Sequence, residues 1–188
     1  MTPPTESVNR VLEEYRAYLE TLKSIQIDPR VRQKFGMSDI VQITLKEASR
    51  DLERIQAMDP DVRKRWLRRM LMNNLFDELR KFQNRPPEVS IDEPLRVAVE
   101  QSSCRVHKWL AVEDTSPSQK MIGDEDGERL LEALAQIDPR QREALILQKW
   151  QGWKLKEIAE YMGCTTKAVA GLHSRGLKAL RKLLPDME

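Results

Sequence analysis

Three residues near the C-terminus have the types and the spacing that two sharply crossing helices need. Ala159 is small enough to lie where the two backbones approach, and Gly163, four residues later, tolerates the positive φ of a tight turn. Val169 supplies an apolar anchor on the second helix. This pattern predicts a helix-turn-helix across residues 155–172, a motif whose second helix enters the major groove of DNA.

The second helix of this motif begins at a pair of threonines and carries charge of one sign. Thr165 and Thr166 can each accept a backbone N–H bond as the N-cap. Residues 165–184 include five lysines or arginines and no aspartate or glutamate. A surface of this kind attracts phosphate, so the pattern favours DNA binding. The alternative is a helical hairpin packed inside a larger bundle, with a solvated basic face.

Composition narrows the possible classes of protein. The chain has 188 residues, of which 33% are charged and 5% aromatic, and this is typical of a helix-rich protein. Its two cysteines, Cys104 and Cys164, show no spacing of metal ligands, so no metal site, no cofactor and no disulfide framework are expected. The sequence shows no carboxylate pair, no nucleophile with a base and no phosphate-binding loop. It therefore does not suggest an enzyme. Without a signal peptide or an apolar run of membrane-spanning length, a cytoplasmic location is expected.

The charges are unevenly distributed along the chain. Residues 61–85 contain eight lysines or arginines against three acidic residues, whereas residues 86–128 contain four against ten. Two basic blocks therefore flank an acidic middle.

The first part of the chain shows three apolar stripes at helical spacing. The first stripe ends near Asp28 and is formed by Val8, Leu12, Tyr15, Leu19 and Leu22. The second begins with Ser38 or Asp39 as N-cap, and the third runs over residues 62–82. Because three such helices can bury one another's stripes, they predict a first domain over residues 5–85.

The rest of the chain divides into a linker and a second domain. Residues 86–126 are acidic and weakly periodic, which predicts a linker that contains a short helix over residues 97–110. Periodicity returns at Gly127 with one helix, and a second helix starts with Asp138 as N-cap. Together with the helix-turn-helix they predict a four-helix domain over residues 127–185. The expected fold is all-α, with two small helical domains joined by an acidic linker.

Four segments together resemble the extracytoplasmic-function sigma factors of bacterial RNA polymerase. They are residues 39–45 (Asp-Ile-Val-Gln-Ile-Thr-Leu), residues 66–80 (Trp-Leu-Arg-Arg-Met-Leu to Asp-Glu-Leu-Arg), residues 134–145 (Leu-Ala-Gln-Ile-Asp-Pro to Glu-Ala-Leu) and the helix-turn-helix. The resemblance covers both domains. The sequences of residues 100–103, 109–111, 116–119 and 168–172 are similar to the branch of this family that is common in planctomycetes.

The resemblance implies a non-enzymatic initiation factor that binds the core enzyme of bacterial RNA polymerase. Its first domain would dock on the polymerase clamp and open the minus-10 element, and its second would read the minus-35 element as double-stranded DNA. An anti-sigma factor is a further possible partner, and no membrane contact is implied.

The resemblance also assigns residues to each role. The positions implied for the melted minus-10 element are Arg65, Arg68, Arg69, Asn73, Asp77 and Arg80. Those implied for polymerase binding are Asp39, Gln42, Ile43 and Lys46. Those for the minus-35 element are Thr165, Thr166, Lys167, Ala170, Arg175 and Lys178, of which the last two lie further along the helix and are expected to hold phosphate.

Three positions leave alternatives open. Ile43 stands where the family usually has a polar residue, so it either makes an apolar contact with the clamp or turns into the core. Trp66 is either a core tryptophan or a stacking surface for an extruded base. The loop over residues 56–61, which should hold the flipped base, is short and lacks the Arg-Gly frequent in the family.

Two other classes of protein compete with this interpretation. A helix-turn-helix repressor or activator would bind duplex DNA independently of polymerase, but it leaves the first domain unexplained. A helical adaptor would bind only protein.

Overall fold

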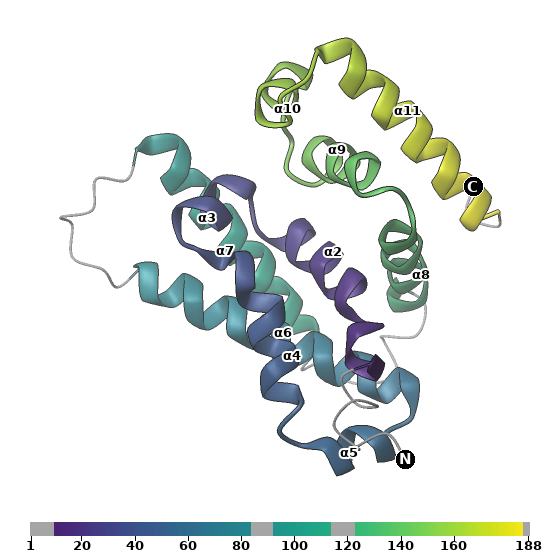
Figure 1. Ribbon diagram of the computed structural model, residues 1–188. Helices are drawn as coiled ribbons and strands as arrows, with labels where there is room; N and C mark the ends of the chain where they lie inside the picture. Colours follow the sequence, from purple (N-terminus) through teal and green to yellow (C-terminus); the bar gives the residue numbers. More distant parts are fainter. Residues whose placement is uncertain (1–9, 84–91, 114–122, 186–188) are drawn as a thin grey trace. The chain divides into compact units, whose positions relative to one another are not determined.

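The computed structural model describes residues 10–83, 92–113 and 123–185, and every regular element in these ranges is helical (Figure 1). The expected all-α fold class is confirmed. The chain forms two compact units, Met1–Thr115 and Ser116–Glu188.

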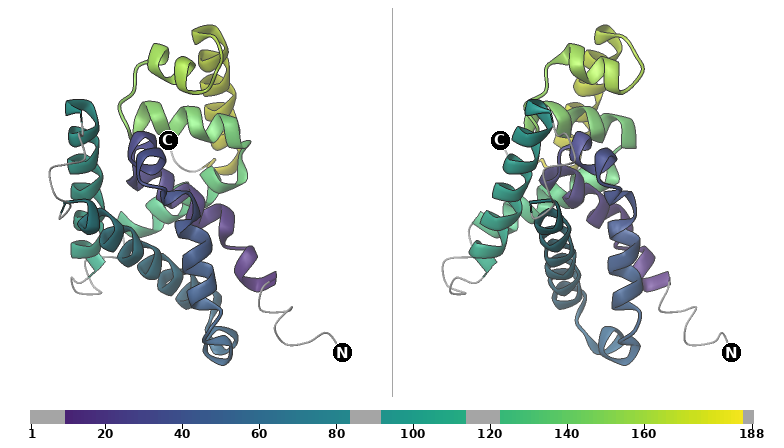
Figure 2. Two further views of the ribbon diagram at one scale, coloured as in Figure 1. Left: turned by 60° about the vertical axis from the view of Figure 1, so that its left-hand side comes forward. Right: turned by 90° about the vertical axis from the view of Figure 1, so that its left-hand side faces the viewer.

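The first unit is organised around one long helix, α6 (Pro60–Gln83). Helices α2, α4 and α7 all pack on it (Figure 2). The other elements of this unit are α2 (Arg16–Gln26), α3 (Pro29–Lys34), the 3₁₀ turn η1 (Met37–Asp39), α4 (Ile40–Ala48), α5 (Leu52–Ala57) and α7 (Glu93–Glu113). The fully buried residues Leu67, Leu71 and Leu75 line the inner face of α6, and burying each stabilises the unit by roughly 1.5 to 3 kcal/mol.

Two of the expected N-terminal helices are shorter in the structure than their apolar stripes suggest. A turn at Tyr15, whose N–H donates to the carbonyl of Leu12 (3.1 Å), precedes α2, and Val8 lies outside the described residues. The expected second helix is divided into α4 and α5. Asp39 occupies the N-cap position of α4, as one of the two expectations had it, but its side chain makes no cap bond, and a 3₁₀ turn leads into the helix.

Helix α7 lies within residues 86–126, which were expected to form a linker. It belongs to the first unit and buries Val99, Ser102 and Val106. The backbone N–H of Asp28 donates to Ser102 Oγ (3.2 Å), which ties α7 to the start of α3. The first unit therefore extends to Thr115 and not to residue 85.

The physical reason for this error is that α7 buries a narrow stripe of small and polar residues, so its helical periodicity is weak. The expected short helix over residues 97–110 lies inside α7. Of the expected linker, residues 86–91 and 114–122 lie outside the described residues.

The second unit has the four helices that the sequence predicts. They are α8 (Gly123–Gln136), α9 (Pro139–Lys149), α10 (Leu155–Tyr161) and α11 (Thr166–Leu183), and α9 contacts the other three. Asp138 is the N-cap of α9, since its carboxylate accepts the N–H groups of Arg140 (3.0 Å) and Gln141 (3.1 Å). Gly152, at φ 71°, follows the C-terminus of α9, as expected.

Within the three described ranges, no helix combines the length and apolar character needed to cross a membrane. The same ranges contain no group of three or more His, Cys, Asp and Glu residues that could hold a metal ion. Cys104 and Cys164 are both free thiols.

Candidate nucleic-acid interface

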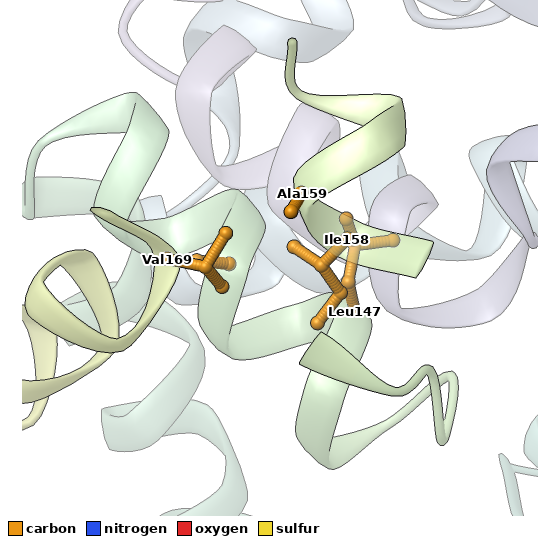
Figure 3. Packing of buried hydrophobic residues seen from close by; sticks show 5 residues of the cluster. Leu147, Ile158, Ala159 and Val169 are labelled. Atoms are coloured by element: carbon orange, nitrogen blue, oxygen red, sulfur yellow. The ribbon is translucent and has the colours of Figure 1, made fainter. Parts of the chain in front are cut away.

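The helix-turn-helix has its own small core, formed where α9, α10 and α11 meet (Figure 3). Leu147, Ile158 and Val169 are fully buried there, and Ala159 lies among them. The structural roles predicted for Ala159 and Val169 are confirmed. Leu155, at the start of α10, is 36% exposed and lies outside this core.

The turn of the motif is closed by backbone hydrogen bonds around Gly163. This glycine has φ 61°, the left-handed conformation predicted for it. The N–H of Cys164 donates to the carbonyl of Ala159 (2.9 Å), and this bond satisfies a carbonyl at the end of α10. On the outer side of α10, the rings of Trp153 and Tyr161 meet edge to face at 5.4 Å. The turn therefore fixes the angle at which α11 leaves α10.

Helix α11 begins at a threonine cap. Thr165 Oγ1 accepts the backbone N–H of Ala168 (3.1 Å), so Thr165 is the N-cap, while Thr166 is the first helical residue. The hydroxyl of Thr166 is left for contacts outside the chain, and both threonines are exposed.

Helix α11 separates buried and charged residues cleanly between two faces. Val169, Gly176 and Leu180 are buried. The exposed residues on the opposite side, called here the α11 face, are Lys167, Ala170, Ser174, Arg175, Lys178, Arg181 and Lys182. Every charge on this face is positive, so it can bind the phosphate backbone, and its N-terminal end has the short side chains that fit close to base edges.

In the first unit, α6 exposes a polar stripe at helical spacing. This α6 stripe consists of Arg65, Arg69, Asn73, Asp77 and Arg80, all exposed. The residues lie three or four positions apart and therefore share one side of the helix, away from the buried leucines. Of the six positions assigned to the minus-10 element, the structure brings these five together.

The sixth position, Arg68, differs from the expectation, because it does not lie on the α6 stripe. Its side chain is only 5% exposed, and its Cζ atom lies 5.1 Å from the ring centroid of Trp109 on α7. Because α7 covers this side of α6, Arg68 does not share the exposed stripe and is unavailable for a surface contact with DNA. The sequence pattern does not predict this contact, because Trp109 lies in the segment interpreted as a linker.

Two more basic residues of α6, Arg63 and Lys64, make contacts that stabilise the fold. The guanidinium of Arg63 donates to the carbonyls of Ile55 and Met58, both at 2.9 Å, and so closes the end of α5. Lys64 lies 5.9 Å from the ring centroid of Tyr18. Arg63 and Lys64 therefore make contacts within the first unit.

Trp66 is neither a core residue nor fully exposed. Its side chain is half-buried, and the Cζ of Arg54 lies 5.8 Å from its ring centroid. Trp66 therefore lies at the edge of the core, and it is next in sequence to Arg65 of the α6 stripe.

Helix α4 presents a second exposed face, formed by Asp39, Gln42, Ile43 and Lys46 and called here the α4 face. Ile43 is 47% exposed, so the alternative that it turns into the core is wrong. The amide of Asn74 on α6 donates to Thr44 Oγ1 (3.0 Å) and to a Glu47 carboxylate oxygen (2.8 Å). These bonds hold α4 on α6, which fixes the α4 face relative to the α6 stripe. Asn74 was not singled out from the sequence, because its role depends on α4.

Comparisons with known proteins point to one family. The family described as "Sigma-70, region 4" matches residues 127–180 of the second unit. The chain is also 36% identical over 87 residues to the RNA polymerase sigma factor CarQ of Myxococcus xanthus, an alignment covering 44% of this chain and 50% of the relative. It is 28% identical over 156 residues to the ECF RNA polymerase sigma factor SigG of Mycobacterium tuberculosis, covering 79% of this chain and 42% of the relative.

A third relative is the ECF RNA polymerase sigma factor BldN of Streptomyces coelicolor, 32% identical over 73 residues that cover 39% of this chain and 28% of the relative. The chain thus spans half or less of the length of these relatives. The matches support the interpretation of the chain as a sigma factor of the extracytoplasmic-function group.

Proposed function

We propose that this chain is an extracytoplasmic-function sigma factor, which binds the core enzyme of bacterial RNA polymerase and directs it to promoters. In this proposal the second unit reads the minus-35 element as a duplex, and the first unit binds the melted minus-10 element. The single observation that carries the proposal is that each unit exposes its own polar or basic helix face, the α11 face and the α6 stripe. A bipartite promoter needs two such surfaces, whereas a simple repressor needs one.

The minus-35 element is assigned to the N-terminal half of the α11 face. Thr166, Lys167 and Ala170 are exposed there, close to the cap that orients the helix. Side chains at the start of a recognition helix reach base edges in the major groove, while residues further along contact the backbone. Thr165 contributes through its cap, and Lys178 contributes a phosphate contact.

The minus-10 element is assigned to the α6 stripe. Its three arginines, Arg65, Arg69 and Arg80, attract the backbone of a single strand, and Asn73 offers both a donor and an acceptor to unpaired base edges. Half-buried Trp66 supplies an aromatic surface next to Arg65. Arg68 takes no part, because α7 covers it.

The polymerase clamp is assigned to the α4 face. Asp39, Gln42 and Lys46 supply polar contacts, and exposed Ile43 supplies an apolar contact where a salt bridge is absent. A central apolar residue with a polar rim is a common arrangement at protein interfaces.

The finer assignments follow from the resemblance in the sequence. We assign the chain to the planctomycete-like branch, expect it to act in the cytoplasm without catalytic activity or cofactor, and include an anti-sigma factor among its possible partners.

The test is reconstitution with bacterial core polymerase. The purified chain should co-elute with core enzyme at one copy per enzyme and direct transcription from defined start sites on genomic fragments. Failure to bind core, combined with tight binding to a duplex site by the chain alone, would favour an independent helix-turn-helix regulator. Failure of both would favour the adaptor.

A further inference from the structure

The guanidinium group of Arg175 lies against the backbone of Gly171 on the α11 face. A Cβ atom built on Gly171 would be 3.2 Å from Arg175 Nη1, 3.7 Å from Nη2 and 3.8 Å from Cζ. The flat guanidinium therefore occupies the space that a side chain at position 171 would fill. Arg175 extends one helical turn toward the N-terminus of α11.

This direction changes which part of the DNA Arg175 can reach. Side chains of a helix lean toward its N-terminus, and four residues correspond to about 6 Å along the axis. The charged end of Arg175 is thus level with Ala170 and Gly171 and not with its own Cα. The N-terminal turns of a recognition helix are those that meet base edges. From the position of its Cα alone, Arg175 is expected to contact phosphate.

The surroundings of Gly171 point to a role in placing Arg175. Glycine destabilises a helix interior relative to alanine, and the three atoms nearest to a Cβ built at position 171 all belong to Arg175. The second glycine of α11 is different, because a Cβ on Gly176 would lie 2.8 Å from Leu145 Cδ1 in the core. Gly176 thus serves packing, whereas Gly171 serves the placement of an exposed arginine.

We propose that Arg175 is a specificity-determining residue that reads a guanine in the upstream promoter element, and that Gly171 is its positioning residue. The planar fork of arginine matches the O6 and N7 acceptors of guanine in the major groove. This inference rests on the proposed function of α11 as the helix that reads the minus-35 element.

The experiment uses polymerase holoenzyme assembled with the full-length chain and a promoter library randomised across the upstream element. Transcripts are sequenced to give the base preference at each position. The wild type should prefer guanine at one base pair. Arg175→Lys keeps the charge but removes the fork, so it should reduce that one preference about 5- to 100-fold and leave the other positions unchanged.

Gly171→Ala should weaken the same preference by a smaller factor, since the guanidinium must move away from the new methyl group. It should not lower the thermal midpoint of unfolding, so loss of folding cannot explain the result. Arg181→Ala is the matched control on the same face, and it should reduce transcription from all sequences alike.

The proposal is overturned if Arg175→Lys leaves every preference unchanged, if the wild-type holoenzyme shows no guanine preference upstream, or if Arg175→Ala weakens all sequences equally and lowers the salt slope by about one unit. Unchanged preference in Gly171→Ala overturns the positioning role. If the chain forms no holoenzyme at all, the proposed function fails. The same variants are then compared by duplex selection with the full chain alone, where loss of guanine preference in Arg175→Lys still supports the inference and unaltered preference defeats it.

Discussion

Arg68 and Trp109 join the last turns of α7 to α6, with the guanidinium carbon 5.1 Å from the centroid of the indole ring. Arg68 is buried, and Trp109 is half-buried. A cation over an aromatic face is worth about 0.5 to 2 kcal/mol, and more when water is excluded. This contact therefore helps to make α7 part of the first unit.

Trp109→Ala should loosen α7 and leave the rest of the first unit folded. Loss of the ring removes both the contact with Arg68 and apolar packing, so amide hydrogens over residues 98–108 should exchange at least tenfold faster. Hydrogen exchange of the full chain, resolved by peptide, measures this. Trp66→Ala is the matched control, because it removes an indole from α6 without touching α7. Equal protection of α7 in the two variants would show that the Arg68 contact does not hold it.

Gly176→Ala should destabilise the second unit. The added methyl group would lie 2.8 Å from Leu145 Cδ1, and Leu145 is itself buried, so the helices must separate. Overpacking of this kind costs about 1 to 3 kcal/mol, partly offset by the better helix propensity of alanine. Urea unfolding followed by circular dichroism measures the loss. The double variant with Leu145→Ala should lose less unfolding free energy than the sum of the losses in the two single variants. Strict additivity would mean that the two sites do not clash.

His173 should make the second unit less stable in mild acid. Its Nε2 atom is buried and makes no hydrogen bond among the residues described, and burial together with the nearby Lys149 charge lowers the pKa of His173 below its usual 6.5. The folded chain therefore binds this proton more weakly than the unfolded chain. The contribution of His173 to stability is complete above pH 6.5 and is lost as the pH falls below that value.

Urea midpoints measured between pH 7.5 and 5.5 check this expectation. His173→Gln should flatten the pH dependence, whatever its effect on stability at neutral pH. A slope that persists in His173→Gln would assign the pH dependence to other groups.

The success of sequence interpretation differed between the two units for a physical reason. In the second unit, Asp138, Gly152 and Gly163 act through the backbone within a few residues of themselves, so their types alone specify where helices begin and end. In the first unit, the position of Arg68 depends on Trp109, forty-one residues away, and no local pattern reports such a contact. The hydrogen bond from Asn74 to α4 could not be predicted from the sequence for the same reason.

Exposure could be predicted only where a helix has a single buried face. The five exposed residues of the α6 stripe follow from helical spacing opposite the leucines. Ile43 could not be placed in this way, because an apolar residue at the edge of a stripe can turn either way. Its exposure is set by the packing of α4 on α6, which Asn74 fixes.

Ile43→Ala should weaken binding to core polymerase without destabilising the chain. Ile43 is 47% exposed, so truncating it alters few contacts within the first unit, and exposed substitutions usually change stability by less than about 0.5 kcal/mol. If the α4 face docks on the clamp, loss of its central apolar side chain should weaken the complex about tenfold. Asp39→Ala combined with Gln42→Ala should add to this effect. Fluorescence titration of labelled core enzyme gives the dissociation constants, with Arg50→Ala as a control just beyond the end of α4. Unchanged affinity in the Ile43 and Asp39/Gln42 variants, with transcription intact, would mean that the clamp contacts another surface of the first unit.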